Sequence, residues 1–438
     1  MTHTSHRFGI AWFPNGNPHS ECFYVAGTLG GSVDNAFALP SDIIWFTNLS
    51  FEAMRDAGIA AAPHLRGDRY LRWPLTHLAD DLGLLNTPTH TLTRTLYAIV
   101  NEALQLLSDA IGDRIPLGPY GLANHIDVPC APRAAKENRD YIDILANAVQ
   151  ITHAMSGVRA PRGSKIARLR TSRLAHYYFA LRETILPAGP FKEMSVPASY
   201  QNMSSARARA YWQNILETKD KAVLVRLSVK SLDPFVARFF SPGHVSGNTQ
   251  NNVRSWFPLD EALLLSHVAT VSVGGALAAP AARDNGTGIV ECLDILAHGG
   301  ISTSASLAAH ILVGAVCGQR DDTVTSIGPF VAAADRCLLA RLAAHLANQG
   351  RVIGSMGAGS VSVFAQNPAF SLNDAAELCA NALATGLMPA KSLLDKIGDV
   401  QTQPAKLNTD PLPGAPGYSA MLRQSEEINR PTIDGEAI

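Results

Sequence analysis

One short segment concentrates positive charge. The stretch VRAPRGSKIARLRTSR, residues 158–173, has no carboxylate and carries six cations within fifteen positions: Arg159, Arg162, Lys165, Arg168, Arg170 and Arg173. Cations at this density can neutralise phosphates along a nucleic-acid backbone, and such contacts are insensitive to base sequence. We therefore hypothesise that the segment contacts RNA, and because Pro161 and Gly163 interrupt it, we expect at least its first half to be an exposed loop. Two other interpretations stay open, an interface with an acidic patch of a neighbouring subunit and a solvated face.

A glycine-rich segment follows a long helical pattern. The stretch RVIGSMGAGSVSVF places Gly354, Gly357 and Gly359 within six positions. Phosphate-binding loops run from a strand through a glycine turn into a helix, whose free N–H groups and dipole meet the anion. Here the expected helix comes first and the alternating SVSVF strand comes after. We predict a structural turn at these glycines and no nucleotide site.

Patterns that mark a catalytic or metal site are missing from the sequence. Fourteen histidines form no HExxH motif, and neither GxSxG nor GxxxxGK[ST] occurs. We expect His298 and His310 to be packed, hydrogen-bonded core residues, because a metal needs three or four converging ligands. Adjacent acids at Asp80–Asp81 and Asp321–Asp322 are expected on a helix and in a solvated loop. The sequence thus predicts no catalytic residue, no cofactor and no metal, and a protein that is not an enzyme.

Two further arginine-containing stretches are less specific. RARAYW, with Arg207, Arg209 and Trp212, could extend a basic surface, but a helix interface explains it equally well. HLRGDRYLRW contains an Arg-Gly-Asp tripeptide at residues 66–68, which acts as a recognition motif only on extracellular proteins. The six cysteines are scattered, with no CxxC pair, and indicate reduced thiols in a cytoplasmic setting.

The clearest element is the helix expected over TPTHTLTRTLYAIVNEALQLLSDAIG, which could serve as a spine. We expect Thr87 to cap it, Pro88 to open it and Gly112 to close it. One face carries the apolar set Leu92, Leu96, Ile99, Val100, Leu104, Leu107 and Ile111. Further helices are expected at 136–155, 171–185, 205–218, 259–267, 303–317, 329–349 and 372–386, and short strands at 222–228, 268–273 and 359–364.

These elements predict a mainly α chain with smaller β parts, an α+β fold built as one large plate-like unit. Residues 1–400 are expected to form this unit, strand- and turn-rich over 1–85 and helical over 86–400. Residues 401–438 are rich in proline and poor in large apolar side chains, so they cannot form a core of their own. Either an extended arm on a neighbouring subunit or a disordered end fits this composition.

Composition narrows the class of protein. Apolar residues make up 47% of the chain and charged residues only 17%, which favours burial of the surface against copies or partners. A formal net charge of −1 gives no global attraction to nucleic acid or to an anionic membrane. The longest apolar helical run is too short to cross a bilayer, so we expect no membrane partner.

The Ala- and Gly-rich stretches SVGGALAAPAARDNGTG and HGGISTSASLAAHILVGAV, the long helix and the scarce lysine resemble capsid proteins of fungal double-stranded RNA viruses, of the totivirus and victorivirus kind. The resemblance implies a structural protein that self-assembles into a closed icosahedral shell around the genome. It implies as partners copies of the chain, weakly and sequence-independently bound RNA and a viral RNA polymerase, in the virion and the host cytoplasm. The alternative functions are a nucleic-acid-binding subunit of a multiprotein complex and an enzyme with no recognisable motif.

Overall fold

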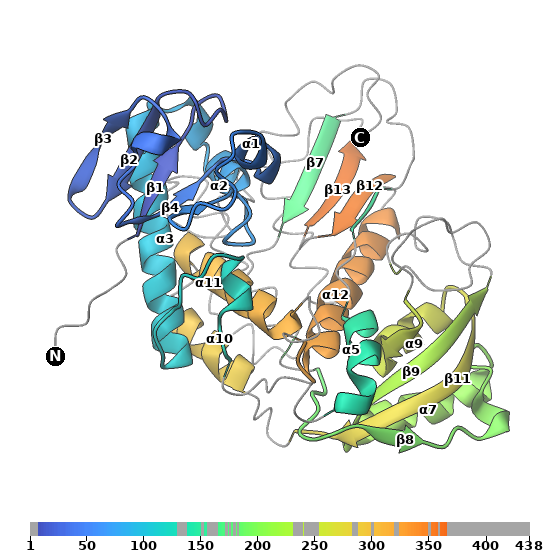
Figure 1. Ribbon diagram of the computed structural model, residues 1–438. Coiled ribbons are helices and arrows are strands. Elements are labelled where there is room, and N and C mark those ends of the chain that lie inside the picture. The colour runs from blue at the N-terminus through green and yellow to red at the C-terminus, as the bar shows by residue number, and fades with distance from the viewer. Residues whose placement is uncertain are drawn as a thin grey trace.

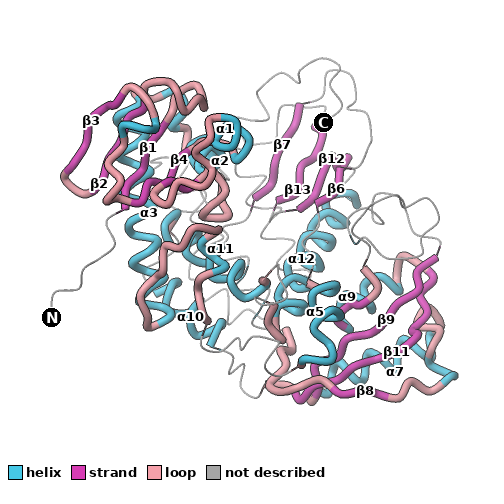
Figure 2. Tube along the Cα trace, viewed as in Figure 1, coloured by secondary structure: helices cyan, strands magenta, loops and turns pink. Residues whose placement is uncertain are grey.

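The computed structural model shows an α+β fold in which three β-sheets surround a group of helices (Figure 1). It describes residues 8–128, 138–149, 153–155, 165–170, 184–230, 254–282, 288–298, 302–318, 324–348, 352–357 and 360–365, together with residues 174, 177, 181 and 240. The alternation of helices and strands along the chain is seen in Figure 2. The sequence-based prediction of an α+β chain is confirmed.

The N-terminal sheet has the strand order β3-β2-β1-β4-β5. Its strands are β1 (Phe8–Trp12), β2 (Cys22–Ala26), β3 (Leu29–Val33), β4 (Ile44–Thr47) and β5 (Leu65–Arg66), and two short helices, α1 (Phe51–Asp56) and α2 (Leu75–Asp81), follow β4 and β5. β1 pairs antiparallel with β2 and parallel with β4. Strand alternation sends Ile10 and Trp12 into the main core and Ala11 and Phe13 into a smaller cluster on the other face. Apolar side chains therefore cover both faces of this sheet.

The expected spine is helix α3 (Thr89–Ile111), and all seven apolar residues predicted for its buried face are buried. It ends at Gly112 as predicted, with the left-handed conformation that glycine tolerates, φ 70°. The start differs from the prediction. Pro88 occupies the N-cap position with no side-chain cap, and the Thr87 hydroxyl donates instead to the carbonyl of Leu84.

The second sheet has the order β10-β9-β11-β8 and is wholly antiparallel in its described pairings. Its strands are β8 (Lys192–Met194), β9 (Lys221–Lys230), β10 (Trp256–Pro258) and β11 (Thr270–Pro280), with helices α7 (Ala206–Thr218) and α9 (Leu259–Ser266). Val223 and Val225 pack in the cluster that contains Trp212 of α7, whereas Ala222 and Leu224 join the main core. The long strands β9 and β11 thus connect two cores.

The third sheet has the order β6-β12-β13-β7. Its strands are β6 (His153–Met155), β7 (Lys165–Arg170), β12 (Val352–Gly357) and β13 (Ser360–Ala365). The glycines predicted to form one turn behave differently, because Gly354 and Gly357 lie within β12 and Gly357 pairs with both Ser360 and His153. A helix expected to run over 136–155 is also wrong at its end, where β6 replaces it and the helix is only α5 (Ile142–Ala148).

Three apolar helices join the sheets: α10 (Gly288–His298), α11 (Thr303–Cys317) and α12 (Gly328–Asn348). Fourteen of the fifteen residues of α11 are buried, and α11 packs on α3, α10 and α12. Short 3-10 helices complete the described chain: η1 (Ala36–Ala38), η2 (Leu84–Asn86), η3 (Leu122–Asn124), η4 (Arg139–Tyr141) and η5 (Ala198–Tyr200). No described helix is long and apolar enough to span a membrane. The expected helix at 372–386 and the arm 401–438 lie outside the described residues.

The Gly112 end of the spine helix gives a test of backbone strain. A Cβ at Gly112 would meet no atom within 4 Å, so Gly112→Ala changes only the backbone preference at φ 70°. We expect it to lower the free energy of unfolding by about 1 kcal/mol. Gly274→Ala is the matched control, since Gly274 also faces open space but without a positive φ. Equal unfolding free energies for the two variants in urea would contradict this account.

Candidate nucleic-acid interface

The cationic segment is only partly a loop. Its residues 165–170 form β7, which pairs with β13 at one edge of the third sheet. The register sets Lys165 opposite Ala365, Arg168 opposite Ser362 and Arg170 opposite Ser360, so no cross-strand neighbour is charged. Arg159, Arg162 and Arg173 lie outside the described residues, and so does the first half that was expected to be a loop.

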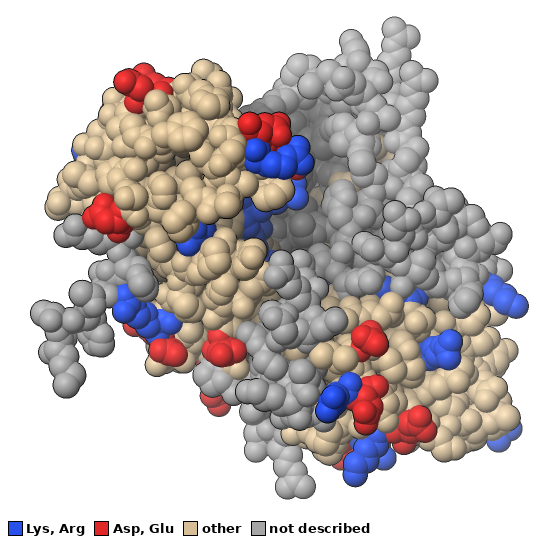
Figure 3. All heavy atoms as spheres, viewed as in Figure 1, with Lys and Arg blue, Asp and Glu red and all other residues tan. Residues whose placement is uncertain are grey.

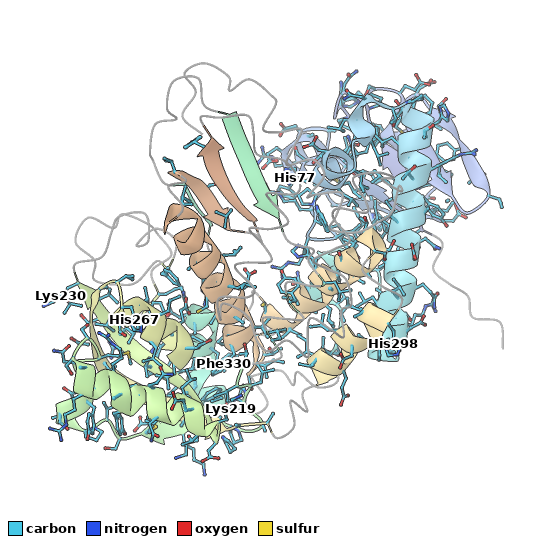
Figure 4. The ribbon with its side chains drawn as sticks, turned by 180° about the vertical axis from the view of Figure 1, so that it is seen from behind. His77, Lys219, Lys230, His267, His298 and Phe330 are labelled. Atoms are coloured by element: carbon cyan, nitrogen blue, oxygen red, sulfur yellow. The ribbon has the colours of Figure 1, made fainter. Side chains whose placement is uncertain are left out.

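The molecular surface is hollowed beside α1, and Lys or Arg atoms line the described wall of the hollow (Figure 3). In Figures 1 and 4, which view the molecule from opposite sides, β7 is the strand of its sheet nearest to α1 and α2. The chain from His64 to His77, here called the Arg66 segment, begins just before β5 and ends in the first turn of α2. It holds three arginines and a single carboxylate: Arg66, Arg69, Arg72 and Asp68.

Arg66 places its guanidinium group inside the protein. Its side chain is 4% exposed and donates to the carbonyl oxygens of Pro63, Leu65 and Leu117, all at 2.9 to 3.0 Å. The guanidinium also lies 5.5 Å from the ring centre of Tyr70. Carbonyl oxygens satisfy a guanidinium without neutralising it, so Arg66 adds positive potential to this region. Its burial also rules out that residues 66–68 act as an exposed recognition tripeptide.

Arg72 adopts a left-handed backbone conformation, φ 63°, that residues other than glycine rarely adopt. Two contacts with α11 hold it there: its Nη1 donates to the Gly314 carbonyl at 2.9 Å, and its own carbonyl lies 3.3 Å from Nε2 of His310. A Cβ on Gly314 would collide with the Arg72 side chain at 2.3 Å. These contacts with the apolar helix α11 therefore fix the position of the Arg72 side chain.

Asp68 does not neutralise these arginines by direct contact in the described structure. Its carboxylate accepts hydrogen bonds from the backbone N–H and the hydroxyl of Thr76, at 3.0 and 2.9 Å, and so caps α2. Burial raises the pKa of Asp68 above its ordinary value, and the two bonds from Thr76 only partly offset this. Arg69 is exposed and, with Arg55, lies near Glu52, whose pKa is lowered first by its hydrogen bonds at the start of α1.

One cluster of three charged side chains lies in the interior of the protein. The carboxylate of Glu261 in α9 accepts two bonds of 2.7 Å from Arg254 and two of 2.7 and 3.0 Å from Arg336 in α12. Exposure of the three side chains is 0%, 0% and 2%, so no ligand reaches them. Burial alone would raise the pKa of Glu261, but the charges and hydrogen bonds of both arginines lower the pKa to about 2. This buried triad is structural.

Of the remaining sequence-based predictions, some are confirmed and one is wrong. His310 is half-buried between the Tyr177 hydroxyl and the Arg72 carbonyl, as expected of a packed histidine. His298 was predicted to be a core residue and is not; it is exposed at the end of α10 (Figure 4). Trp212 is fully buried and Arg209 donates to the Ser204 and Ser266 carbonyls, so both serve the packing of α7. Asp321 and Asp322 lie outside the described residues.

The Arg66 segment is the feature that sequence reasoning missed. Its signal was present, since HLRGDRYLRW sets three arginines among two aromatic residues, but the spacing matched no known motif. Only the fold shows that Asp68 is engaged with α2 and that Arg66 donates to three carbonyl oxygens beside the Tyr70 ring. Within the described ranges, no group of three or more His, Cys, Asp or Glu could hold a metal ion.

No family model matches this sequence, and no curated protein matches it. Solved structures of Phi29 DNA polymerase do match. An orthorhombic crystal form gives a TM-score of 0.41 at 10% identity, over 78% of this chain and 76% of that chain. The complexes with primer-template DNA and with single-stranded DNA each give 0.40, at 9% and 11% identity, over 82% of this chain and 80% of those chains.

These structures correct two sequence-based predictions. The chain was expected to be a structural capsid protein forming a closed shell, and not an enzyme, but the similar solved structures given above are those of a DNA polymerase. Both predictions are wrong, and the expected shell of identical copies has no support. With TM-scores below 0.5 the likeness assigns no activity to this chain, so we argue function from its own residues.

The buried triad predicts a large loss of stability when its one acid is neutralised. Glu261→Gln leaves two buried guanidinium groups without their carboxylate, and we expect the free energy of unfolding to fall by about 3 kcal/mol or more. Arg55→Gln, which breaks the exposed Arg55–Asp56 pair, should change it by less than about 1 kcal/mol. Urea unfolding at pH 7 measures both variants. Similar effects of the two substitutions would refute the structural role of the triad.

The lowered pKa of Glu261 also predicts that the protein loses stability in acid. Because the folded-state pKa of Glu261 lies below its ordinary value of 4.5, its contribution is complete above that value and is lost as the pH falls toward about 2. Wild-type stability should therefore decline over this range. The decline should be shallower in Glu261→Gln, which a urea series at stepped pH values would show.

The pKa shift of Asp68 is opposite in sign to that of Glu261. The pKa of Asp68 is raised in the folded state, so the folded protein holds this proton more tightly and loses stability as the pH rises from 3.8 through the raised pKa. Asp68→Asn removes the titration and keeps an oxygen for the Thr76 N–H. We expect its stability relative to wild type to increase from acid to neutral pH. Asp68→Ala, which loses the cap of α2, should be less stable than Asp68→Asn at every pH by about 1 kcal/mol.

Proposed function

We propose that this chain is a nucleic-acid-binding protein that contacts the phosphate backbone along the edge strand β7. One observation carries the proposal: Lys165, Arg168 and Arg170 lie on an edge strand whose cross-strand neighbours on β13 are all uncharged. Cations without a carboxylate across the strand retain their attraction for an external anion. A backbone of regularly spaced phosphates is the ligand that suits a line of cations.

The Arg66 segment supports the same ligand. Arg69 is exposed, and the guanidinium of the buried Arg66 donates to carbonyl oxygens. Among the solved structures with a low likeness to this fold, three are named as complexes with DNA. At their TM-scores they add no weight to the proposal, which rests on the cations.

Binding of this kind is expected to be weak and insensitive to sequence. The formal net charge of −1 supplies no long-range attraction, so the affinity depends on a few local contacts. Contacts to phosphates release counterions, and the binding constant falls with salt by about 0.9 log units per log of salt for each phosphate neutralised on a duplex.

The test removes two cations of β7. For Arg168→Gln/Arg170→Gln we expect weaker binding of a fluorescein-labelled RNA duplex and a salt dependence shallower by up to about 1.8 log units, about 0.9 for each lost phosphate contact. Fluorescence anisotropy at several salt concentrations measures both quantities. A DNA duplex of the same sequence shows whether the contact distinguishes the sugar.

The matched control removes equal charge elsewhere. Arg94→Gln/Arg139→Gln replaces two exposed arginines on α3 and η4, and its salt dependence should equal that of the wild type. Equal slopes for the β7 variant and the control would show that β7 does not contact the backbone. If the β7 variant instead lost self-association at unchanged nucleic-acid affinity, the strand would be a subunit interface and the proposal would fail.

A further inference from the structure

Helix α7 and the 3-10 helix η5 bring three planar side chains together, here called the Tyr200 stack: Tyr200, Tyr211 and Arg207. The rings of Tyr200 and Tyr211 are parallel within 3°, with centroids 4.0 Å apart. The Arg207 guanidinium carbon lies 5.8 Å from the centre of the Tyr200 ring. Arg207 and Tyr211 are four residues apart on α7, so they lie one turn apart on the same face of the helix.

Contacts with the buried Trp212 hold the two tyrosines in place. Trp212, fully buried, donates its indole N–H to the Tyr200 carbonyl at 2.9 Å and meets the Tyr211 ring edge-on at 5.3 Å. Ser205 caps α7 by accepting from the N–H of Ala208. Both tyrosines are half-buried, so neither ring is enclosed. The stack is a preorganised aromatic surface on a rigid helix.

The positive charge of the Tyr200 stack is not paired with a carboxylate among the described residues. Arg207 is exposed, and among the described residues its contact is the Tyr200 ring, with no hydrogen bond or ion pair to a carboxylate. The first turn of α7 has no acidic residue, although the helix dipole favours one there. Arg209 lies in the same part of the helix, and its Nε is buried without a hydrogen-bond partner in the described structure. His267, exposed and labelled in Figure 4, lies 3.5 Å from Arg209.

We propose that the Tyr200 stack is a base-stacking platform for single-stranded nucleic acid. Aromatic rings and guanidinium planes stack on any base, and the unbalanced cations beside them suit the adjoining phosphates. Bases paired in a duplex are already stacked on both faces, so this surface selects unpaired bases. The inference rests on the proposed function only in requiring that the chain binds nucleic acid, since the platform lies on α7 and η5, apart from the sheet of β7, and makes different contacts.

The experiment separates bases from phosphates. Binding of a labelled 20-nucleotide DNA strand is compared with binding of an abasic strand of equal length, which keeps every phosphate and has no base to stack. Arg207→Lys keeps the charge and loses the planar group, and Tyr211→Leu removes one ring. We expect each variant to bind the natural strand roughly five- to tenfold more weakly than wild type, by the usual strength of base–aromatic stacking. Neither should change the affinity for the abasic strand.

Two controls keep the result interpretable. Tyr211→Phe retains the ring and should bind both strands as wild type does. Arg207 is exposed, so Arg207→Lys tests the stack even if Tyr211→Leu does not fold, which thermal unfolding reveals. An RNA strand of the same sequence should show the same losses, because stacking does not require either sugar.

The outcomes distinguish the two proposals. Arg168→Gln/Arg170→Gln should weaken natural and abasic strands alike, since it removes phosphate contacts, whereas the stack variants should affect the natural strand alone. If Arg207→Lys and a folded Tyr211→Leu bind both strands as the wild type does, while the β7 variant is weakened, the platform is refuted and the proposed function stands. Equal weakening of both strands by Arg207→Lys also refutes stacking. A wild-type protein that binds neither strand overturns both proposals.

Discussion

Glu261 is the point at which the separate parts of this chain are joined. Its two carboxylate oxygens each accept from both Arg254 and Arg336, and Nη2 of each arginine also reaches the Ala148 carbonyl at the end of α5. Arg254 precedes β10, Glu261 is in α9 and Arg336 is in α12, so the interaction ties a sheet to two helices. Charges in an apolar interior are unfavourable unless paired with good geometry, and so the elements must meet in one arrangement.

The placement of the third sheet follows from that arrangement. The helix α12 continues toward β12, which pairs with β13, and β13 in turn carries β7 at the edge. The cations of β7 therefore owe their position to a helix fixed by a carboxylate in another part of the chain. A second fixed helix, α11, has the same role for the Arg66 segment, because Gly314 and His310 hold Arg72 in its left-handed conformation.

The candidate interfaces share a physical feature although they lie on different elements. In each, the described groups around the cations are uncharged or engaged elsewhere: serines and an alanine lie opposite the cations of β7, Asp68 caps α2, and Arg207 rests on an aromatic ring. A chain with nearly balanced total charge can thus present positive regions where acids are absent or engaged. Overall composition and local electrostatics are separate properties of this protein.

The sequence by itself determined the elements whose signals are local. The apolar period of α3 and its Gly112 end, the strands β9 and β13, and the helices α7, α9, α11 and α12 all lie close to the predicted ranges, since side-chain period and glycine conformation act within a few residues. The strand predicted at 268–273 is only the start of β11, which continues to Pro280. It also located the cations of β7. Tertiary structure alone decided that 165–170 is a strand and that β6 ends a predicted helix, because pairing with β12 and β13, some two hundred residues away, outweighs local preference. Likewise the Tyr200 stack and the Glu261 triad join residues separated along the chain, and no local pattern specifies such contacts.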